Sequence, residues 1–282
     1  MVKLSAIQLN SSPDIETNIA RIGELLGTLD NAYEHLVVLP ECCLSFGGSE
    51  KSLLNLAQED AKLRANESIR QSLLSSLSDL AKKHRVFLVA GTIPIFVPSL
   101  NKYTNTSCVF SSAGELMTQY DKIHLFDVNV GDGNAYCESS YTQAGKAVKT
   151  VQLPFSHVGL SVCYDLRFPE LYRALSKLGA EIITVPSAFT KNTGQAHWQA
   201  LLQARAIENQ CYVIAAAQWG MHKNGRETWG HSMIISPWGK IINCLSEGSG
   251  IITTDFKPQD ITRIRQAMPV HTHNQFIVEL QN

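Results

Sequence analysis

The sequence predicts an α/β protein with mixed β-sheets at its centre and helices outside them. Short, continuously apolar runs recur along the chain, as is typical of strands buried on both faces. Helical patterns separate several of these runs, which favours parallel strands. Turn signals between other apolar runs indicate antiparallel hairpins, so the sheets are expected to be mixed.

In the first half of the chain, residues 1–9 predict a first strand. This stretch is apolar, but it lacks the apolar core and the small-residue cleavage site of a signal peptide. Residues 36–39 and 86–90 predict two further strands, and a helical pattern at residues 73–82 precedes the second of these.

Three more buried strands are predicted later in the chain, and two helices lie between them. The strands are residues 158–162, 182–185 and 213–217. Apolar residues at positions i, i+3, i+4 and i+7 predict one helix over residues 171–178, which Gly179 ends, and a second over residues 198–205. Hairpins are expected at the turns 112–115 and 237–240.

The bulk composition indicates an ordinary globular protein. The chain has 282 residues, of which 44% are hydrophobic and 17% charged, and no repeat, low-complexity segment or linker divides it. The formal net charge is −1 and no run of lysines and arginines occurs, which argues against nucleic acid or an anionic membrane as partner. No apolar run reaches the ~20 residues of a membrane span.

The seven cysteines do not form a disulfide pattern. Their number is odd and they are scattered, so we expect a reducing compartment and a cytoplasmic protein. Neither a C-x-x-C pair nor a metal-binding histidine spacing is present, so we expect no metal. The pair Gly47-Gly48 lacks the surroundings of a phosphate-binding loop.

Cys163 is the first candidate catalytic residue. It stands where the apolar strand 158–162 ends, and polar Tyr164 and Asp165 follow at once. A thiol on such a turn can act as a nucleophile, and a following helix N-terminus and a nearby cation would lower its pKa. The alternative is a small buried core cysteine, which is the usual role of this residue.

Glu41 and Lys122 could supply the remaining chemistry. Glu41 follows the apolar strand 36–39, and a carboxylate there can take a proton from a thiol and return it to a leaving amine. Lys122 follows a strand and precedes apolar residues, where its ammonium can stabilise an oxyanion. The alternatives are a solvent-facing acid and an ordinary surface lysine.

Two histidines, His124 and His197, could each act as the base of a Cys–His pair. Neither lies in a signature of such enzymes, so we expect structural or interface roles for both. We expect Trp198 and the stripe that follows it to serve packing or subunit contact.

Together, three segments of the chain resemble motifs of the nitrilase superfamily. They are Leu39-Pro40-Glu41, residues 120–128 (YDKIHLFDV) and residues 162–170 (VCYDLRFPE). The similarity extends over nearly the whole chain. It implies an α-β-β-α sandwich with two mixed central sheets, in a single carbon–nitrogen hydrolase domain over residues 1–282. It also implies subunits that pair through helices into a homodimer or a larger homo-oligomer, for which the stripe at Leu171, Leu175 and Leu178, or that at Trp198 and Leu202, could serve.

The resemblance implies roles for individual residues. Glu41 matches the general base, Lys122 the lysine and Cys163 the nucleophile of a Glu–Lys–Cys triad that hydrolyses or condenses carbon–nitrogen bonds. Glu138 matches an accessory glutamate of the catalytic site. The backbone N–H of Tyr164 would complete an oxyanion hole with the lysine.

Within the superfamily, the chain resembles the branch of deaminated glutathione amidase and omega-amidase, with its later segments closer to the former. The resemblance implies hydrolysis of deaminated glutathione to 2-oxoglutarate and cysteinylglycine, a metabolite-repair reaction through a thioester that needs no cofactor. Gln195, where the branch usually has proline, and Trp219 depart from the pattern and leave the acyl-chain and leaving-group preference open.

Alternatives remain at this level. The chain could be an omega-amidase acting on 2-oxoglutaramate or 2-oxosuccinamate, another amidase or carbamoyl hydrolase of the superfamily, or a catalytically silent binding protein. The intact Glu41, Lys122 and Cys163 argue against the last.

An acidic substrate needs cations or N–H donors at its carboxylates. The expected substrate-binding residues are Arg167, Phe189, Thr190 and His197. Arg173 and Arg205 are further cations. For Arg167 and Arg205 we favour a structural alternative, pairing with Glu170 and Glu208.

Overall fold

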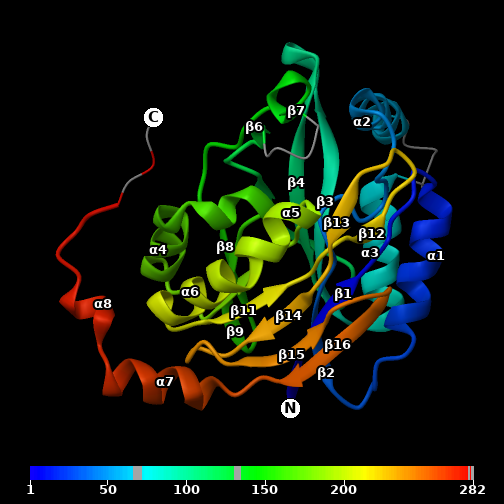
Figure 1. Cartoon of the computed structure of the whole chain (residues 1–282). Helices are drawn as coiled ribbons and strands as arrows, with labels where there is room; N and C mark the ends of the chain where they lie inside the picture. The colour runs from blue at the N-terminus through cyan, green and yellow to red at the C-terminus, as the bar shows by residue number, and fades with distance from the viewer. Residues whose placement is uncertain (66–71, 130–134, 279, 281–282) are drawn as a thin grey trace.

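Two six-stranded mixed sheets lie face to face at the centre of the protein, and helices cover their outer faces (Figure 1). The computed structural model describes residues 1–65, 72–129, 135–278 and 280. Helices α1 (Ile15–Leu26) and α3 (Leu73–His84) lie outside one sheet, and α4 (Pro169–Lys177) and α6 (Gln199–Asn209) outside the other. The predicted α-β-β-α sandwich is therefore confirmed.

The first sheet has the order β16-β1-β2-β3-β4-β5. Its strands β1 to β3 are parallel to one another, and its other neighbouring pairs are antiparallel. Its members are β16 (Gly250–Asp255), β1 (Val2–Gln8), β2 (Glu34–Val38), β3 (Phe87–Val97), β4 (Lys102–Phe110) and β5 (Leu116–Asp121).

The second sheet has the order β15-β14-β11-β10-β9-β8, with β9, β10 and β11 parallel. Its members are β15 (Ile241–Leu245), β14 (Ser232–Ile235), β11 (Tyr212–Ala215), β10 (Ile182–Thr184), β9 (Ser156–Leu160) and β8 (Thr150–Leu153). Two short hairpins lie outside these sheets: β6 (Asp127–Asn129) with β7 (Ala135–Cys137), and β12 (Trp219–Met221) with β13 (Glu227–Trp229). The other α-helices of the described residues are α2 (Glu50–Ala65), α5 (Lys191–Thr193), α7 (Pro258–Ala267) and α8 (Val270–His273).

Strand β2 shows why the central strands are continuously apolar. Successive side chains of a strand point to opposite faces. Leu36 and Val38 pack into the cluster between the two sheets, whereas Val37 and Leu39 pack into the cluster under α1 and α3. All four are fully buried, so no position in this run is free to be polar.

The predicted elements are confirmed with small shifts at their ends. The strands expected at residues 36–39, 86–90 and 158–162 are β2, β3 and β9, and both expected hairpins form, as β4–β5 and β14–β15. Helix α4 ends before Gly179, whose φ of 92° suits a residue without a Cβ.

The stripes expected at a subunit interface lie inside the chain's own core, except at one residue. Leu171, Leu175, Trp198 and Leu202 are at most 5% exposed, and only Leu178 is on the surface. Of the two roles left open for such stripes, packing and subunit contact, these four buried residues have the first. In a sequence, a one-sided apolar stripe looks the same whether it faces its own sheet or another subunit.

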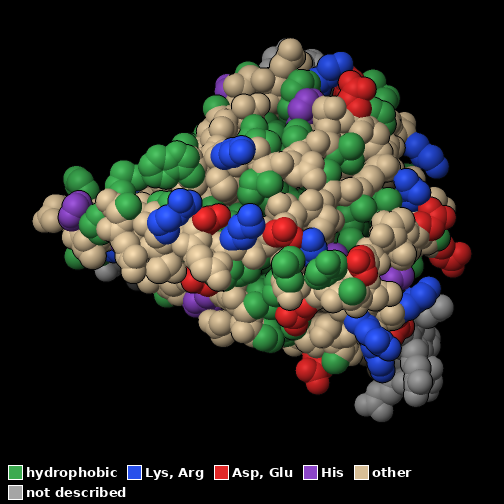
Figure 2. Space-filling view, turned by 90° about the horizontal axis from the view of Figure 1, so that it is seen from below, with side chains coloured by type: hydrophobic (Ala, Val, Ile, Leu, Met, Phe, Trp, Pro, Cys, Tyr) green, Lys and Arg blue, Asp and Glu red, His purple; other side chains and the backbone are tan. Residues whose placement is uncertain are grey.

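The surface shows no concentration of one charge on the face drawn in Figure 2, where Lys and Arg side chains alternate with Asp and Glu. The C-terminal segment projects from the body beyond α8 (Figure 1). Phe276 and Ile277 on this segment are about four-fifths exposed.

Candidate active site

Three short loops bring the catalytic candidates together. Glu41 lies in the turn after β2, Lys122 directly follows β5, and Cys163 begins the 3₁₀ turn η3 (Cys163–Arg167) after β9. They come from both sheets and line one pocket together with Glu138. Exposure is only 5%, 2% and 6% for Glu41, Lys122 and Cys163, so each charge needs a partner here.

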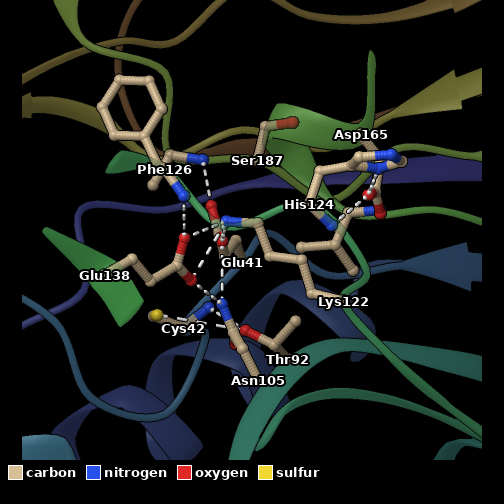
Figure 3. Close-up of polar contacts among 12 residues, drawn as sticks. Glu41, Cys42, Thr92, Asn105, Lys122, His124, Phe126, Glu138, Asp165 and Ser187 are labelled. Carbon is tan, nitrogen blue, oxygen red and sulfur yellow. Dashed lines mark hydrogen bonds and ion pairs between the residues drawn. The ribbon is translucent and has the colours of Figure 1, made fainter. Parts of the chain in front are cut away.

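The Glu41 carboxylate is held through both of its oxygens. Oε1 accepts hydrogen bonds from Lys122 Nζ at 3.0 Å and from Asn105 Nδ2 at 2.9 Å (Figure 3). Oε2 accepts the backbone N–H of Ala188 at 3.0 Å. These donors favour the ionised carboxylate and fix its orientation.

The Glu138 carboxylate lies on the other side of the ammonium group. Its oxygens are 2.8 and 3.1 Å from Lys122 Nζ, and they also accept the backbone N–H of Phe126 at 2.7 Å and Asn105 Nδ2 at 3.2 Å (Figure 3). The ammonium is therefore bound by two carboxylates, and Asn105 bridges the same two carboxylates.

This arrangement keeps both signs of charge. Burial alone would raise the pKa of Glu41, but Lys122 and the hydrogen bonds outweigh it, so the pKa lies below its usual value. Burial would lower the pKa of Lys122, but Glu138 and Glu41 hold it well above its usual value. At neutral pH the Glu41 carboxylate is ionised and the Lys122 ammonium is protonated.

The Cys163 thiol departs from the expectation of a lowered pKa. Burial raises the pKa of this thiol well above its usual value, and the neighbouring Glu41 carboxylate raises it further, with Lys122 opposing both. The prediction was wrong because it counted a helix end and a cation but neither the depth of the site nor the carboxylate. The Glu41 carboxylate and this thiol line the same pocket and shift each other's pKa, so Glu41 is the neighbouring group that could accept the thiol proton.

The turn that carries Cys163 is strained and held by Asp165. Cys163 has φ of +49°, the left-handed region that costs a side-chain-bearing residue about 1–2 kcal/mol. One oxygen of the fully buried Asp165 carboxylate accepts the Val162 N–H at 2.9 Å and the Tyr120 hydroxyl at 2.7 Å. The other accepts the N–H of His124 at 3.0 Å and contacts its Nδ1 at 2.7 Å (Figure 3).

His124 therefore has the structural role expected from the sequence. Its ring contacts Asp165 through Nδ1 and stacks on Phe168 with ring centres 3.6 Å apart. Trp198 is fully buried and donates to the His231 carbonyl at 2.8 Å, which confirms its packing role.

The expected substrate-binding residues divide into two groups. Phe189 and Thr190 line the pocket, as does Tyr164. Arg167 and His197 are not among the described lining residues. They contact each other, with both terminal guanidinium nitrogens 3.3 Å from the imidazole Nδ1.

The other two arginines have structural partners. Arg205 pairs with Glu208 at 2.9 Å, as the structural alternative predicted, and also donates twice to the Leu166 carbonyl. Arg173 donates to the Glu208 carbonyl at 2.8 Å.

The sequence did not single out three further residues of the site. They are Asn105, Asp165, which supports the turn at Cys163, and Arg226, which lines the pocket. A usable signal existed for the first: residues 104–107 are four consecutive polar residues, all buried, inside a strand. Arg226 lies in a short loop without any motif.

Among the described residues, no three His, Cys, Asp or Glu side chains gather as metal ligands would. None of the described helices combines the length and the apolar character needed to cross a membrane. All seven cysteines are free thiols.

Comparison with known proteins agrees with this geometry. The profile of the carbon–nitrogen hydrolase family matches residues 3–266. A deaminated glutathione amidase of Synechocystis sp. is 41% identical over 276 residues, covering 97% of this chain and 98% of the relative. The deaminated glutathione amidase of Homo sapiens is 36% identical over 275 residues, covering 96% of this chain and 81% of the relative.

Solved structures share the fold over the whole chain. The NitFhit protein of C. elegans superimposes with a TM-score of 0.89 at 33% identity, covering 99% of this chain and 67% of that chain. Saccharomyces cerevisiae Nit3, a member of branch 10 of the nitrilase superfamily, gives 0.83 at 31% identity, covering 98% and 97%. This chain belongs to the carbon–nitrogen hydrolase family of the nitrilase superfamily and is a hydrolase of carbon–nitrogen bonds other than peptide bonds.

Proposed function

We propose that the protein is an amidase that hydrolyses deaminated glutathione to 2-oxoglutarate and cysteinylglycine, in metabolite repair. One observation carries the chemistry: a buried ammonium, Lys122, lies between two carboxylates in the pocket that the Cys163 thiol also lines. The names of the relatives, at 36–41% identity over nearly the full chain, support the substrate.

In the acylation step, Glu41 removes the proton from Cys163 and the sulfur attacks the amide carbonyl carbon. Lys122 and the backbone N–H of Tyr164 stabilise the oxyanion that forms. The proton on Glu41 then passes to the departing amine as the carbon–nitrogen bond breaks. The acyl group remains on sulfur as a thioester.

In the deacylation step, a water molecule attacks the thioester carbonyl. Glu41 accepts a proton from this water, and Glu138 helps to position it. The carbon–sulfur bond breaks, the acid leaves, and the proton returns to the sulfur of Cys163. No net proton or electron remains on the enzyme, so the cycle needs no cofactor.

We further infer that residues 1–282 form a single domain, that the protein works in the cytoplasm and that it assembles as a homodimer or a larger homo-oligomer. The family match over residues 3–266 supports the first of these. The free cysteines are consistent with a reducing compartment. Sedimentation equilibrium of the purified chain tests the third.

Release of 2-oxoglutarate from deaminated glutathione and from 2-oxoglutaramate, measured in parallel, tests the proposal. We expect the wild type to turn over the tripeptide analogue faster and Cys163→Ala to be inactive on both. Cys244→Ala is the matched control, since this thiol is exposed and outside the pocket lining, and it should retain activity. Faster turnover of 2-oxoglutaramate would make the protein an omega-amidase. A Cys163→Ala variant with normal turnover would exclude the mechanism.

A further inference from the structure

The charges that line the pocket are unevenly paired. Among its described lining residues, two are acidic (Glu41 and Glu138) and two are basic (Lys122 and Arg226). Lys122 bonds to both carboxylates, so these three side chains form one group with a net charge of −1. Arg226 forms no ion pair with a described residue, although it faces the same cavity.

The Arg226 side chain is nevertheless held in place. It lies in the turn between β12 and β13, and its terminal nitrogen donates to the Ala188 carbonyl at 2.7 Å. Its guanidinium lies 5.1 Å from the ring centre of Phe46 and 5.2 Å from that of Tyr136, both of which line the pocket. Cation–π contacts of this kind position a guanidinium without neutralising it.

Arg226 also lies close to the reaction centre. Ala188, whose carbonyl accepts from Arg226, donates its own N–H to Glu41, and the charge of Arg226 contributes to the lowered pKa of Glu41. A group bound to this guanidinium would therefore lie within the same cavity as Glu41 and Cys163.

One donor of the guanidinium is unused. Arg226 Nε is buried and has no hydrogen-bond partner among the described residues. A buried donor without an acceptor costs about 1–3 kcal/mol. A planar carboxylate suits this guanidinium, since it can accept parallel N–H bonds from it.

We propose that Arg226 binds a carboxylate of the amide substrate and thereby sets a preference for acidic amides. This assignment rests on the proposed function, because it concerns the same pocket. The carboxylate belongs either to the 2-oxo acid that forms the thioester or to the C-terminus of the peptide that leaves, and the substrates below distinguish the two.

The test compares wild type with Arg226→Gln on deaminated glutathione, its C-terminal carboxamide and 2-oxoglutaramate. If Arg226 binds the leaving peptide, kcat/KM for deaminated glutathione falls by about 10- to 150-fold, the worth of a charged hydrogen bond. The other two substrates then change by less than about threefold. If Arg226 binds the carboxylate of the acyl group, kcat/KM falls by a similar factor for all three substrates. In either case Arg226→Lys recovers part of the loss, mainly through KM.

Two controls separate binding from damage to the fold. Lys223→Gln removes a positive charge from the same turn at an exposed residue outside the pocket lining, and it should leave all three substrates unchanged. Alkylation of Cys163 by neutral iodoacetamide, followed by peptide mass spectrometry, reports the state of the nucleophile without any carboxylate. Its rate should be the same in Arg226→Gln as in wild type.

Three outcomes would overturn the assignment. Arg226→Gln with unchanged kcat/KM on all three substrates would show that the residue binds none of their carboxylates. A fall in the rate of Cys163 alkylation as large as the fall in kcat/KM would show that Arg226 has a structural role instead. Wild-type protein that hydrolyses none of the three would overturn the proposed function itself, and the role of Arg226 with it.

Discussion

Replacing Asp165 by asparagine would test whether one buried carboxylate holds the nucleophile in place. The side chain is fully buried and each oxygen accepts one backbone N–H, that of Val162 at 2.9 Å or that of His124 at 3.0 Å. Asparagine has the same size but only one oxygen. Whichever way its amide turns, its NH₂ group faces one of these two backbone donors.

The magnitude follows from these contacts. The backbone N–H that loses its acceptor costs about 1–3 kcal/mol. The bonds that remain lose their charge assistance, at about 1 kcal/mol each. The sum is about 3–5 kcal/mol, and at about 2 °C per kcal/mol for a chain of this size, Tm should fall by about 6–10 °C.

Thermal unfolding and turnover should be measured on the same Asp165→Asn preparation. Because Cys163 occupies the left-handed region that this carboxylate supports, we expect kcat/KM to fall by about tenfold or more. Asp14→Asn is the matched control: Asp14 accepts the Thr17 N–H at a helix N-terminus on the surface, where asparagine caps equally well. An Asp165→Asn protein with Tm within about 2 °C of wild type and normal turnover would refute this reasoning.

Three further predictions concern charge. Lys122→Ala should lower kcat by about 10²–10³-fold or more, because an oxyanion donor is lost and two carboxylates face each other unpaired; near-normal kcat would contradict its role. The pKa of Glu41 is lowered and the pKa values of Lys122 and Cys163 are raised, so none of the three should titrate between about pH 6 and 8. We therefore expect kcat/KM to be nearly independent of pH over this range. A tenfold rise would contradict a thiol that is protonated in the resting enzyme. Burial lowers the pKa of His222 to about 4. In the unfolded chain this histidine binds its proton near pH 6.5, before the folded protein does. The free energy of unfolding should therefore fall by up to about 3 kcal/mol as the pH drops from about 6.5 to 4. Denaturant titrations at several pH values should show that His222→Gln loses most of this pH dependence of the free energy of unfolding. The control His273→Gln, at an exposed residue, should retain it. The same pH dependence in His222→Gln as in wild type would contradict the lowered pKa of His222.

Much of the fold was predictable because local patterns and tertiary burial agree. Residues 36–39 are apolar without interruption because alternate side chains face two different clusters, and such a run admits few other structures. The same continuity explains why Glu41 could be identified: the first acidic residue after a fully buried strand lies at the edge of the sheet.

The stripes on α4 and α6 could not be assigned from the sequence. An amphipathic stripe specifies that a helix face is covered but not by what. The structure shows Leu175 and Leu202 packed in the chain's own core. The roles of Arg167 and His197 depend likewise on which side of a turn faces the pocket, which spacing does not encode.

The sequence by itself determined mixed sheets with helices outside them and the candidate residues Glu41, Lys122 and Cys163, because periodicity and ordered motifs are properties of neighbouring residues. Its resemblance to a known family implied the sandwich. Only the tertiary structure decided the ionisation of the thiol, the bridging role of Asn105 and the unpaired guanidinium of Arg226. These depend on burial and on distances between residues far apart in the chain: Glu41 and Lys122 are 81 positions apart in sequence and 3.0 Å apart in space. The strength of such a charge interaction depends on the distance between the groups in the folded chain and on the exclusion of water around them. A local sequence pattern specifies neither.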